Sequence, residues 1–180
     1  MPVSVLTAAP GPDQMAEART VYAAAFGQAP YHEDDQQVTA FSERVLRYAA
    51  ERHGFRFVTA RDPDGRMTGL ALAVLAEPGD WWRDQAAAAL PGPEAARWLG
   101  DLCLEVVHVA VTPAVQRQGT GKRLHGALIS GPPAPTSVLS CHPDAGPAQR
   151  LYLGQGWTLL TDDFRTAGGQ PGYWLMARDL

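Results

Sequence analysis

The sequence predicts a mixed α/β (α+β) fold in a single domain, and three observations support this prediction. The chain has 180 residues, enough for one domain of ordinary size with a buried core. Strand-like and helix-like apolar patterns follow one another in the order β-α-α-β-β-β-α-β-α-β-β. Near the middle, a nearly continuous apolar segment leads into a glycine-rich turn and a helix. Since no internal repeat or linker divides the chain, we expect one domain over residues 1–180.

The first third of the chain is expected to form one short strand and two helices. The strand covers Val3–Thr7, and the helices cover Gln14–Phe26 and Asp35–Arg52, where apolar residues recur at helical spacing. Asp13 has a side chain suited to the N-cap of the first helix. The second helix should end at His53-Gly54, because glycine readily adopts the backbone that terminates a helix.

A hairpin and a buried strand are predicted next. Phe55–Arg61 and Met67–Leu75 are strand-like and are joined by Asp62–Gly65, whose residues favour a tight turn. Glu77–Gly100 is irregular, although its alanine-rich part can form a helix. Leu102–Val111 is almost entirely apolar, which is typical of a strand buried on both faces.

The remaining elements are short and follow a glycine-rich turn. They are expected, in order, as a helix at Gly119–Ile129, a strand at Ser137–Cys141, a helix at Pro147–Leu153, and strands at Thr158–Leu160 and Tyr173–Arg178.

The composition is that of a soluble globular protein, with 46% hydrophobic and 19% charged residues. A net charge of −4 argues against a nucleic-acid partner and suits a cationic acceptor. The N-terminus lacks the pattern of a signal peptide, and no apolar run is suited to span a bilayer. We therefore expect a cytoplasmic protein without a membrane partner, for which a homodimer is one possible assembly.

The two cysteines, Cys103 and Cys141, lie far apart in apolar, strand-like segments. Neither belongs to a CxxC pair or a His-Cys cluster. Buried, reduced thiols are therefore expected, and neither a disulfide nor a metal site is.

Gln116–Gly121 carries the strongest functional signal. The segment lies between the buried strand and a helix, and its two glycines leave the backbone open to a ligand. The amides at a helix N-terminus carry the positive end of the helix dipole. The segment therefore predicts a site for a phosphate or pyrophosphate group, the alternative being a turn that binds nothing.

Two common nucleotide-binding patterns fail in this segment. The Walker pattern requires a glycine where Gln116 stands and a serine or threonine where Arg123 stands. The dinucleotide pattern GxGxxG requires a third glycine where Leu124 stands. A nucleotide-binding protein therefore remains only a third alternative.

Gln116–Gly121 instead matches the (Q/R)xxGx(G/A) signature of the GNAT acetyltransferase superfamily. Downstream, Ala148–Trp157 resembles the A-x-x-LY-x-x-x-GF segment of that family, with Trp157 in place of the phenylalanine. The close resemblance covers about Cys103–Trp157. It departs at Ala145, where the family often has an asparagine, and this puts a cofactor contact from that position in doubt.

This resemblance implies a central, mostly antiparallel sheet with a splayed parallel strand pair and helices on both faces. It implies an N-acetyltransferase that moves the acetyl group of acetyl-CoA to a primary amine of a small molecule or peptide by direct attack. The backbone of Val109 and Val111 would pair with the pantetheine arm, and an amide near Val109 would serve as the oxyanion donor. The cofactor-binding loop would comprise Gln116, Arg117, Gln118, Gly119, Thr120, Gly121 and Lys122.

Amide formation from a thioester needs a base for the amine proton and benefits from an acid for the departing thiolate. The resemblance assigns the acid to Tyr152, which alternatively packs its helix onto the sheet. Glu105 lies eleven residues before Gln116, as the catalytic glutamate does in the histone-acetylating branch, and is our candidate base. Its alternative is a hydrogen-bonded structural carboxylate. His108, the other polar interruption of the buried run, is more typical of a satisfied core histidine, and alternation places it on the opposite face from Glu105 unless a bulge intervenes.

The resemblance places the acceptor pocket at Phe26–Gln37 and at Glu77–Gly100. Within the first, Tyr31–Asp35 offers acidic groups that attract amines, although acidic runs usually lie solvated on the surface, as we expect here. Within the second, Trp81 and Trp82 form either an aromatic wall for a cation or a cover for the core. A rival function is an acyl-CoA-binding sensor or interaction module that has lost catalysis.

Overall fold

A computed structural model describes residues 2–166 and 172–180 of the chain. Its strands form a seven-stranded sheet in the order β1-β2-β3-β4-β5-β7-β6. β4 pairs with β5 in parallel, whereas the pairs β1–β2, β2–β3, β5–β7 and β6–β7 are antiparallel. The predicted mixed α/β, mostly antiparallel fold is confirmed. The strands are β1 (Val3–Leu6), β2 (Arg56–Arg61), β3 (Met67–Ala76), β4 (Cys103–Val111), β5 (Thr136–Cys141), β6 (Thr158–Phe164) and β7 (Tyr173–Asp179).

The helices agree with the sequence patterns except in one region. Residues 77–100, expected to be irregular apart from an alanine-rich part, contain two helices. In the part of the chain that the structure describes, no helix has the length and apolar character needed to cross a membrane. The helices are α1 (Pro12–Phe26), α2 (Asp35–Glu51), α3 (Trp81–Ala88), α4 (Gly92–Trp98), α5 (Thr120–Ile129), α6 (Gly146–Leu153) and a 3₁₀ turn, η1 (Pro113–Val115).

The prediction that Asp13 caps α1 is wrong. The N-cap is Gly11, and Pro12 occupies the first helical position, where proline is favoured because its fixed φ suits the helix and no amide is lost. The Gly11 amide donates to Oε1 of Gln14 at 3.2 Å, so a side chain from the first turn closes this end. Asp13 lies within the first turn instead.

The chain divides into two compact units, each built from two separate segments. Unit 1 comprises Met1–Val74 and Val107–Ser130, and unit 2 comprises Leu75–Val106 and Gly131–Leu180. β3 and β4 therefore each contribute residues to both units. That residues 1–180 act as a single domain stays a prediction.

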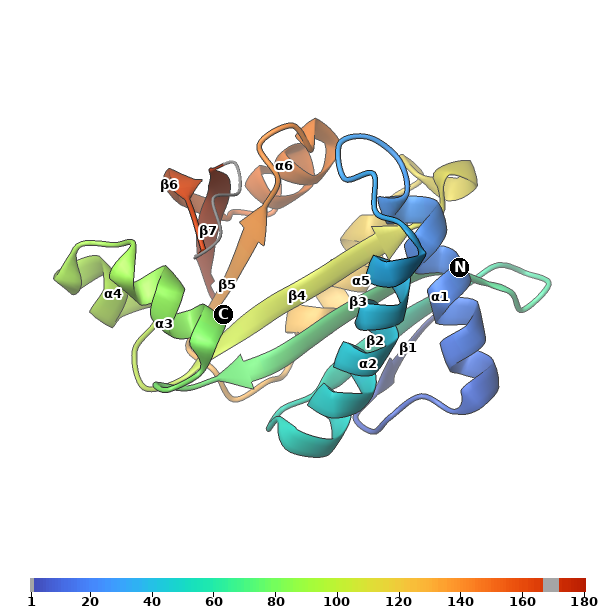
Figure 1. Ribbon diagram of the computed structural model, residues 1–180, viewed down its shortest axis with the longest axis horizontal. Coiled ribbons are helices and arrows are strands. Elements are labelled where there is room, and N and C mark those ends of the chain that lie inside the picture. The colour runs from blue at the N-terminus through green and yellow to red at the C-terminus, as the bar shows by residue number, and fades with distance from the viewer. Residues whose placement is uncertain (1, 167–171) are drawn as a thin grey trace. The chain divides into compact units, whose positions relative to one another are not determined.

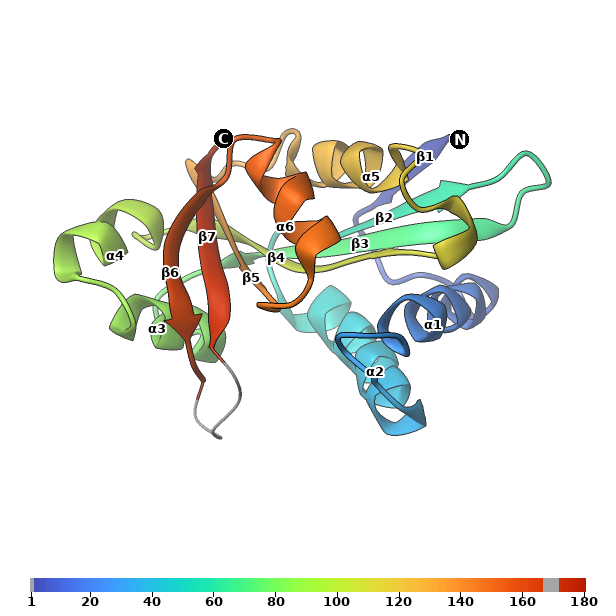
Figure 2. The ribbon, with the colours of Figure 1, turned by 90° about the horizontal axis from the view of Figure 1, so that it is seen from above.

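Unit 1 packs helices on both faces of its strands. α1 and α2 lie on one face of β1–β3 and α5 lies on the other (Figure 2). In the core between the sheet and the first two helices, the rings of Tyr22 and Phe41 stack with centroids 4.1 Å apart. The Arg56 side chain tethers the C-terminal end of α5 to β2 by donating to the carbonyls of Leu128 at 2.8 Å and of Ala127 and Ser130 at 2.9 Å.

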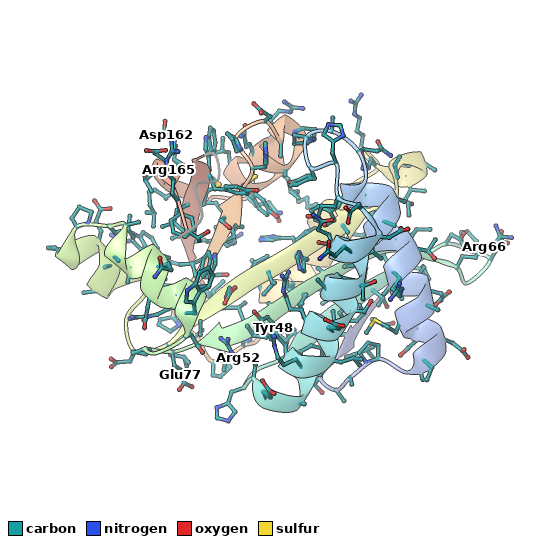
Figure 3. The ribbon with its side chains drawn as sticks, in the orientation of Figure 1. Tyr48, Arg52, Arg66, Glu77, Asp162 and Arg165 are labelled. Carbon is teal, nitrogen blue, oxygen red and sulfur yellow. The ribbon has the colours of Figure 1, made fainter. Side chains whose placement is uncertain are left out.

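The hairpin of unit 1 has the predicted turn. Gly65 adopts a positive φ of 83°, and Oδ1 of Asp62 accepts from the amide of Arg66 at 2.9 Å. Arg66 lies at the tip of this hairpin, whereas Tyr48 and Arg52 lie at the C-terminal end of α2, with the Arg52 guanidinium 5.3 Å from the Tyr48 ring centroid (Figure 3).

Unit 2 places β5, β7 and β6 side by side, with α6 on one side and α3 and α4 on the other (Figures 1 and 2). The hydroxyl of Thr136 donates to the Trp98 carbonyl at 2.8 Å and links β5 to α4. Both cysteines are free and buried, as expected. β6 extends to Phe164, beyond the predicted end at Leu160, because its register against β7 shifts and breaks the alternating pattern that sequence reading relies on.

Candidate functional site

The loop between β4 and α5, in unit 1, has the backbone geometry of an anion site. Gly119 is the N-cap of α5 and lies in the left-handed region at φ 78°, and Arg117 has φ 61°. Because Gly119 offers no side chain, no side-chain hydrogen bond caps the helix. The first amides of α5 are donors at the positive end of the helix dipole. The predicted glycine-rich turn before a helix is therefore confirmed as a structural element.

Gln116 holds this loop to the strand that precedes it. Its side-chain Nε2 donates to the Val111 carbonyl at 3.0 Å and spans η1. The Val111 carbonyl is one of the groups expected to pair with pantetheine, so Gln116 positions the strand end as well as the loop. Contacts of Gln116, Val109 and Val111 with a ligand stay predictions.

Arg123, in the first turn of α5, lies against the loop and was not identified by the motif. Its Nη2 lies 3.4 Å from the Gln118 carbonyl and 3.3 Å from Oγ1 of Thr120, so the guanidinium lies along the loop. A Cβ at Gly119 would lie 3.4 Å from Nη1 of Arg123. Arg123 lies four residues after Gly119, one helical turn along, and this spacing could have predicted that its side chain lies beside the loop. Together with Arg117 and Lys122, Arg123 surrounds the loop with exposed positive charge.

Close packing fixes the position of α5. Thr120, Leu124 and His125 on its inner face are buried. A Cβ at Gly69 on β3 would lie 2.8 Å from Cδ1 of Leu124 and 3.2 Å from the Ala110 carbonyl oxygen. Glycine at this position therefore lets the helix approach the strands closely.

Glu105 and Tyr152, the candidate base and acid, belong to unit 2. Glu105 is 5% exposed and lies opposite Val138 in the parallel pairing of β4 and β5. Tyr152 is 7% exposed at the end of α6, with its ring 5.7 Å from that of Trp157. Their catalytic roles stay predictions.

The turn before α6 is closed without the asparagine that is common in the GNAT family. Ala145 is the N-cap of α6 and makes no side-chain cap. His142 takes over part of the role of the missing asparagine, since Nδ1 of His142 accepts from the Asp144 amide at 3.1 Å. Nε2 of Gln149 donates to the Pro143 carbonyl at 2.6 Å. The departure at position 145 therefore leaves the turn intact.

His108 is satisfied within unit 1, as the sequence favoured. Nη1 of Arg44 lies 3.0 Å from Nε2 of His108, and since arginine only donates, Nε2 accepts and the ring proton is assigned to Nδ1. Burial and the positive charge of Arg44 lower the pKa of His108 to about 3. The imidazole is therefore neutral near pH 7, but the lone pair it would need as a base is occupied.

The α1–α2 connection contains most of the acidic residues considered for the acceptor. Asp34 caps α2, since its Oδ1 accepts from the amides of Gln36 at 2.8 Å and Gln37 at 3.3 Å, and Asp35 is exposed. The expectation of a surface position is met for these two residues. Glu33 differs from them: the residue is half-buried, and its Oε2 is buried and has no hydrogen-bond partner among the described residues.

A backbone hydrogen bond holds Glu33 against the end of α1. Its amide donates to the Phe26 carbonyl at 2.9 Å and closes the connection onto the end of α1. The carboxylate then lies against Tyr22, which is 3% exposed. Burial and the neighbouring Glu33 carboxylate raise the pKa of the Tyr22 hydroxyl, so this phenol stays protonated and acts as a donor.

A separate pocket of about 220 Å³ lies in unit 2. Trp82 packs its ring 5.9 Å from Phe164 and so helps to cover the core, whereas Trp81 is 60% exposed. The expectation that the pair covers the core is therefore met by Trp82, whereas an aromatic wall for a cation stays a prediction. The pocket is lined by Trp81, Trp82, Ser140, Phe164, Thr166 and Tyr173.

The predicted site residues are thus distributed over both units. Unit 1 holds the loop and the strand end that precedes it, and unit 2 holds Glu105 and Tyr152. Within residues 2–166 and 172–180, no group of three or more His, Cys, Asp or Glu side chains is arranged to hold a metal ion.

No protein-family model matches the chain, and no curated protein matches it. Solved structures do resemble it over nearly its whole length. NAA60 from Arabidopsis thaliana, in complex with a bisubstrate analogue, has a TM-score of 0.66 and 14% identity over 99% of this chain and 98% of its own.

Two microbial enzymes give similar results. For the ribosomal-protein-S18-alanine N-acetyltransferase from Escherichia coli, the TM-score is 0.60 and the identity 18%, over 99% of this chain and 94% of the other. For the PaiA N-acetyltransferase from Thermoplasma acidophilum, in complex with coenzyme A, the values are 0.64 and 10%, over 100% of both chains. The chain therefore has the fold of these N-acetyltransferases, which is the fold that the resemblance implied.

Proposed function

We propose that the chain is an acetyl-CoA-dependent N-acetyltransferase of the GNAT superfamily that acts on a primary amine of a small molecule or peptide. One observation supports this proposal more than any other. The loop before α5 combines a left-handed Gly119, helix amides without a side-chain cap, and the Arg123 guanidinium alongside. These groups suit a diphosphate, and the loop departs from both common nucleotide patterns at specific residues.

In this proposal the cofactor lies along unit 1. The backbone of Val109 and Val111 pairs with the pantetheine arm. The diphosphate is bound by the loop, to which Gln116, Arg117, Gln118, Gly119, Thr120, Gly121 and Lys122 contribute. Arg123 donates a charge-assisted hydrogen bond to the diphosphate, and such a bond is stronger than one between neutral groups.

The reaction is a direct attack of a neutral amine nitrogen on the thioester carbonyl. A carbon–nitrogen bond forms, and the carbonyl oxygen gains negative charge that the amide near Val109 stabilises. Glu105 accepts the proton that the nitrogen loses. The carbon–sulfur bond then breaks, and Tyr152 donates a proton to the leaving thiolate. Burial raises the proton affinity of a carboxylate, which suits Glu105 as a base near neutral pH.

The test combines binding with turnover. Isothermal titration with acetyl-CoA, CoA and ATP should give binding for the first two only. Release of free CoA thiol should then be followed over a panel of amines and peptides. Binding of acetyl-CoA without turnover on any acceptor would favour a sensor or interaction module, and binding of ATP alone would favour a nucleotide-binding protein. A cytoplasmic location, the absence of a nucleic-acid or membrane partner, and a homodimer stay predictions.

A further inference from the structure

Four residues of unit 1 form a cluster at the end of α1 and in the α1–α2 connection. We call Tyr22, Phe26, Tyr31 and Glu33 the Glu33 cluster. The ring centroids of Tyr31 and Phe26 are 4.7 Å apart, and those of Phe26 and Tyr22 are 4.6 Å apart. Three aromatic rings thus follow one another beside a single carboxylate.

The carboxylate of Glu33 is under-satisfied. Tyr22 is its phenolic neighbour, and Oε2 is buried without a hydrogen-bond partner among the described residues. An ionised carboxylate accepts several hydrogen bonds, and leaving a buried oxygen unpaired is unfavourable. The nearby Arg44 directs Nη1 to His108 instead. The arrangement therefore suits an N–H donor from outside the chain, and a positively charged one most of all, since aromatic faces also attract cations.

The Glu33 cluster lies beside the strand segment that would present the acetyl group. The ring of His108 on β4 is 5.3 Å from that of Tyr22 and 5.9 Å from that of Phe26. The next residue along β4 is Val109, to which the proposed function assigns the pantetheine and oxyanion contacts. A ligand bound at Glu33 would therefore lie close to the reacting carbonyl.

The nitrogen held by Glu33 differs from the nitrogen that reacts. A carboxylate beside an amine favours its ammonium form, and an ammonium has no lone pair for the attack. From these contacts we infer that the acceptor carries two nitrogens: a charged ammonium bound by Glu33 and a neutral amine that takes the acetyl group. The half-buried rings of Phe26 and Tyr31 pack against the carbon chain that joins them. The acceptor class is thus a small diamine, an inference that rests on the proposed function.

The test compares 1,4-diaminobutane, butylamine and 4-aminobutanol as acceptors at saturating acetyl-CoA. The protein should show a KM for the diamine at least tenfold below that for either single amine. Glu33→Gln should raise the diamine KM at least tenfold and leave the KM of butylamine and the Kd of acetyl-CoA unchanged. Glu43→Gln, which removes the same charge from an exposed position of α2, should leave all three values unchanged.

A direct measurement keeps the inference falsifiable if the variant is unstable. Binding of 1,4-diaminobutane to the protein without acetyl-CoA should be followed by NMR, using the Tyr22 and Tyr31 ring signals, with Tyr22→Phe as a second variant that retains the ring. A lower melting temperature of Glu33→Gln with an unchanged diamine KM would overturn the inference and leave Glu33 as a structural partner of Tyr22. So would equal KM values for diamine and butylamine.

The two proposals fail separately. If Glu33→Gln does not change the turnover of amines, the acetyltransferase proposal is retained and the diamine inference is contradicted. Glu33-dependent binding of the diamine without release of CoA thiol supports the cation site and contradicts the acetyltransferase proposal. Neither binding nor turnover of the diamine contradicts the inference outright.

Discussion

Arg44 on α2 and His108 on β4 are joined by a hydrogen bond of 3.0 Å between Nη1 and Nε2. The bond links a helix to the strand that precedes the loop, and it keeps a positive charge next to a histidine that is surrounded by aromatic rings. The charge and the burial act in the same direction, since both disfavour the imidazolium.

His108 should make the stability of the protein depend on pH. Its pKa is lowered from 6.5 to about 3, so between these values the unfolded chain binds a proton that the folded protein does not. The contribution of His108 to the free energy of unfolding should have its full value above pH 6.5 and fall as the pH decreases towards 3. Urea unfolding from pH 4 to pH 7 should give a shallower dependence for His108→Phe.

Gly119 should be required for acetyl-CoA binding. At φ 78° a side chain is strained by about 1–2 kcal/mol, so Gly119→Ala should reshape the loop and weaken binding. Gly126→Ala is the matched control, because it lies within the same helix with open space around it. It should keep the affinity and stabilise the helix by about 1 kcal/mol. Isothermal titration that finds equal affinities for both variants would remove the loop from the cofactor site.

Arg123→Met should weaken acetyl-CoA binding about ten- to a hundredfold, because a charge-assisted hydrogen bond contributes about 1.5–3 kcal/mol. The affinity of the variant should also depend less on salt concentration, since one cation of the loop is gone. Arg66→Met removes a charge from the exposed hairpin tip of the same unit and should change neither quantity. Titrations at 50 and 500 mM salt distinguish the variants.

Glu105→Gln should lower the rate of acetyl transfer most at low pH, where few acceptor amines are already neutral and the base matters most. The rate should approach that of the unmodified protein as the pH rises above the pKa of the amine. Glu51→Gln, at the exposed end of α2, serves as the control. A pH profile of Glu105→Gln that parallels the unmodified one at all pH values would exclude Glu105 as the base.

Tyr152→Phe should lower kcat with little change in the Kd of acetyl-CoA, since it removes only the hydroxyl that protonates the leaving thiolate. The ring contact with Trp157 remains in this variant, so the packing between these two rings should be retained. An unaltered kcat would instead assign Tyr152 to packing. Steady-state kinetics and a thermal melt on the same sample decide between these outcomes.

Local patterns predicted the parts of the fold that depend on local physics. The Asp62–Gly65 turn, the strand β4, which is fully buried only over Cys103–Val106 and at Ala110, and the glycine loop before α5 are each specified by residues within a few positions. The helices α3 and α4 were less visible, because they are short and neither has a side-chain cap. Their positions are stabilised by tertiary contacts in the core of unit 2, which a window along the chain does not contain.

The same limit applies to the site. The loop motif was readable because its residues are contiguous. Glu33 and His108, by contrast, acquire their surroundings only when α1 and α2 pack against β4. An acidic run reads as solvated surface until the bond between the Glu33 amide and the Phe26 carbonyl turns one of its members inward. Contacts between residues that are distant in sequence therefore determine the surroundings of Glu33 and His108, which no local motif could predict.

The chain passes between the two units three times, at Val74–Leu75, Val106–Val107 and Ser130–Gly131. This has a consequence for biosynthesis, where domains tend to fold from the N-terminus as they emerge. Unit 1 cannot complete its second face until α5 has left the ribosome, and by then only the end of β3, α3, α4 and the start of β4 represent unit 2. The nascent chain therefore holds the first three strands with one face uncovered while about fifty residues are added.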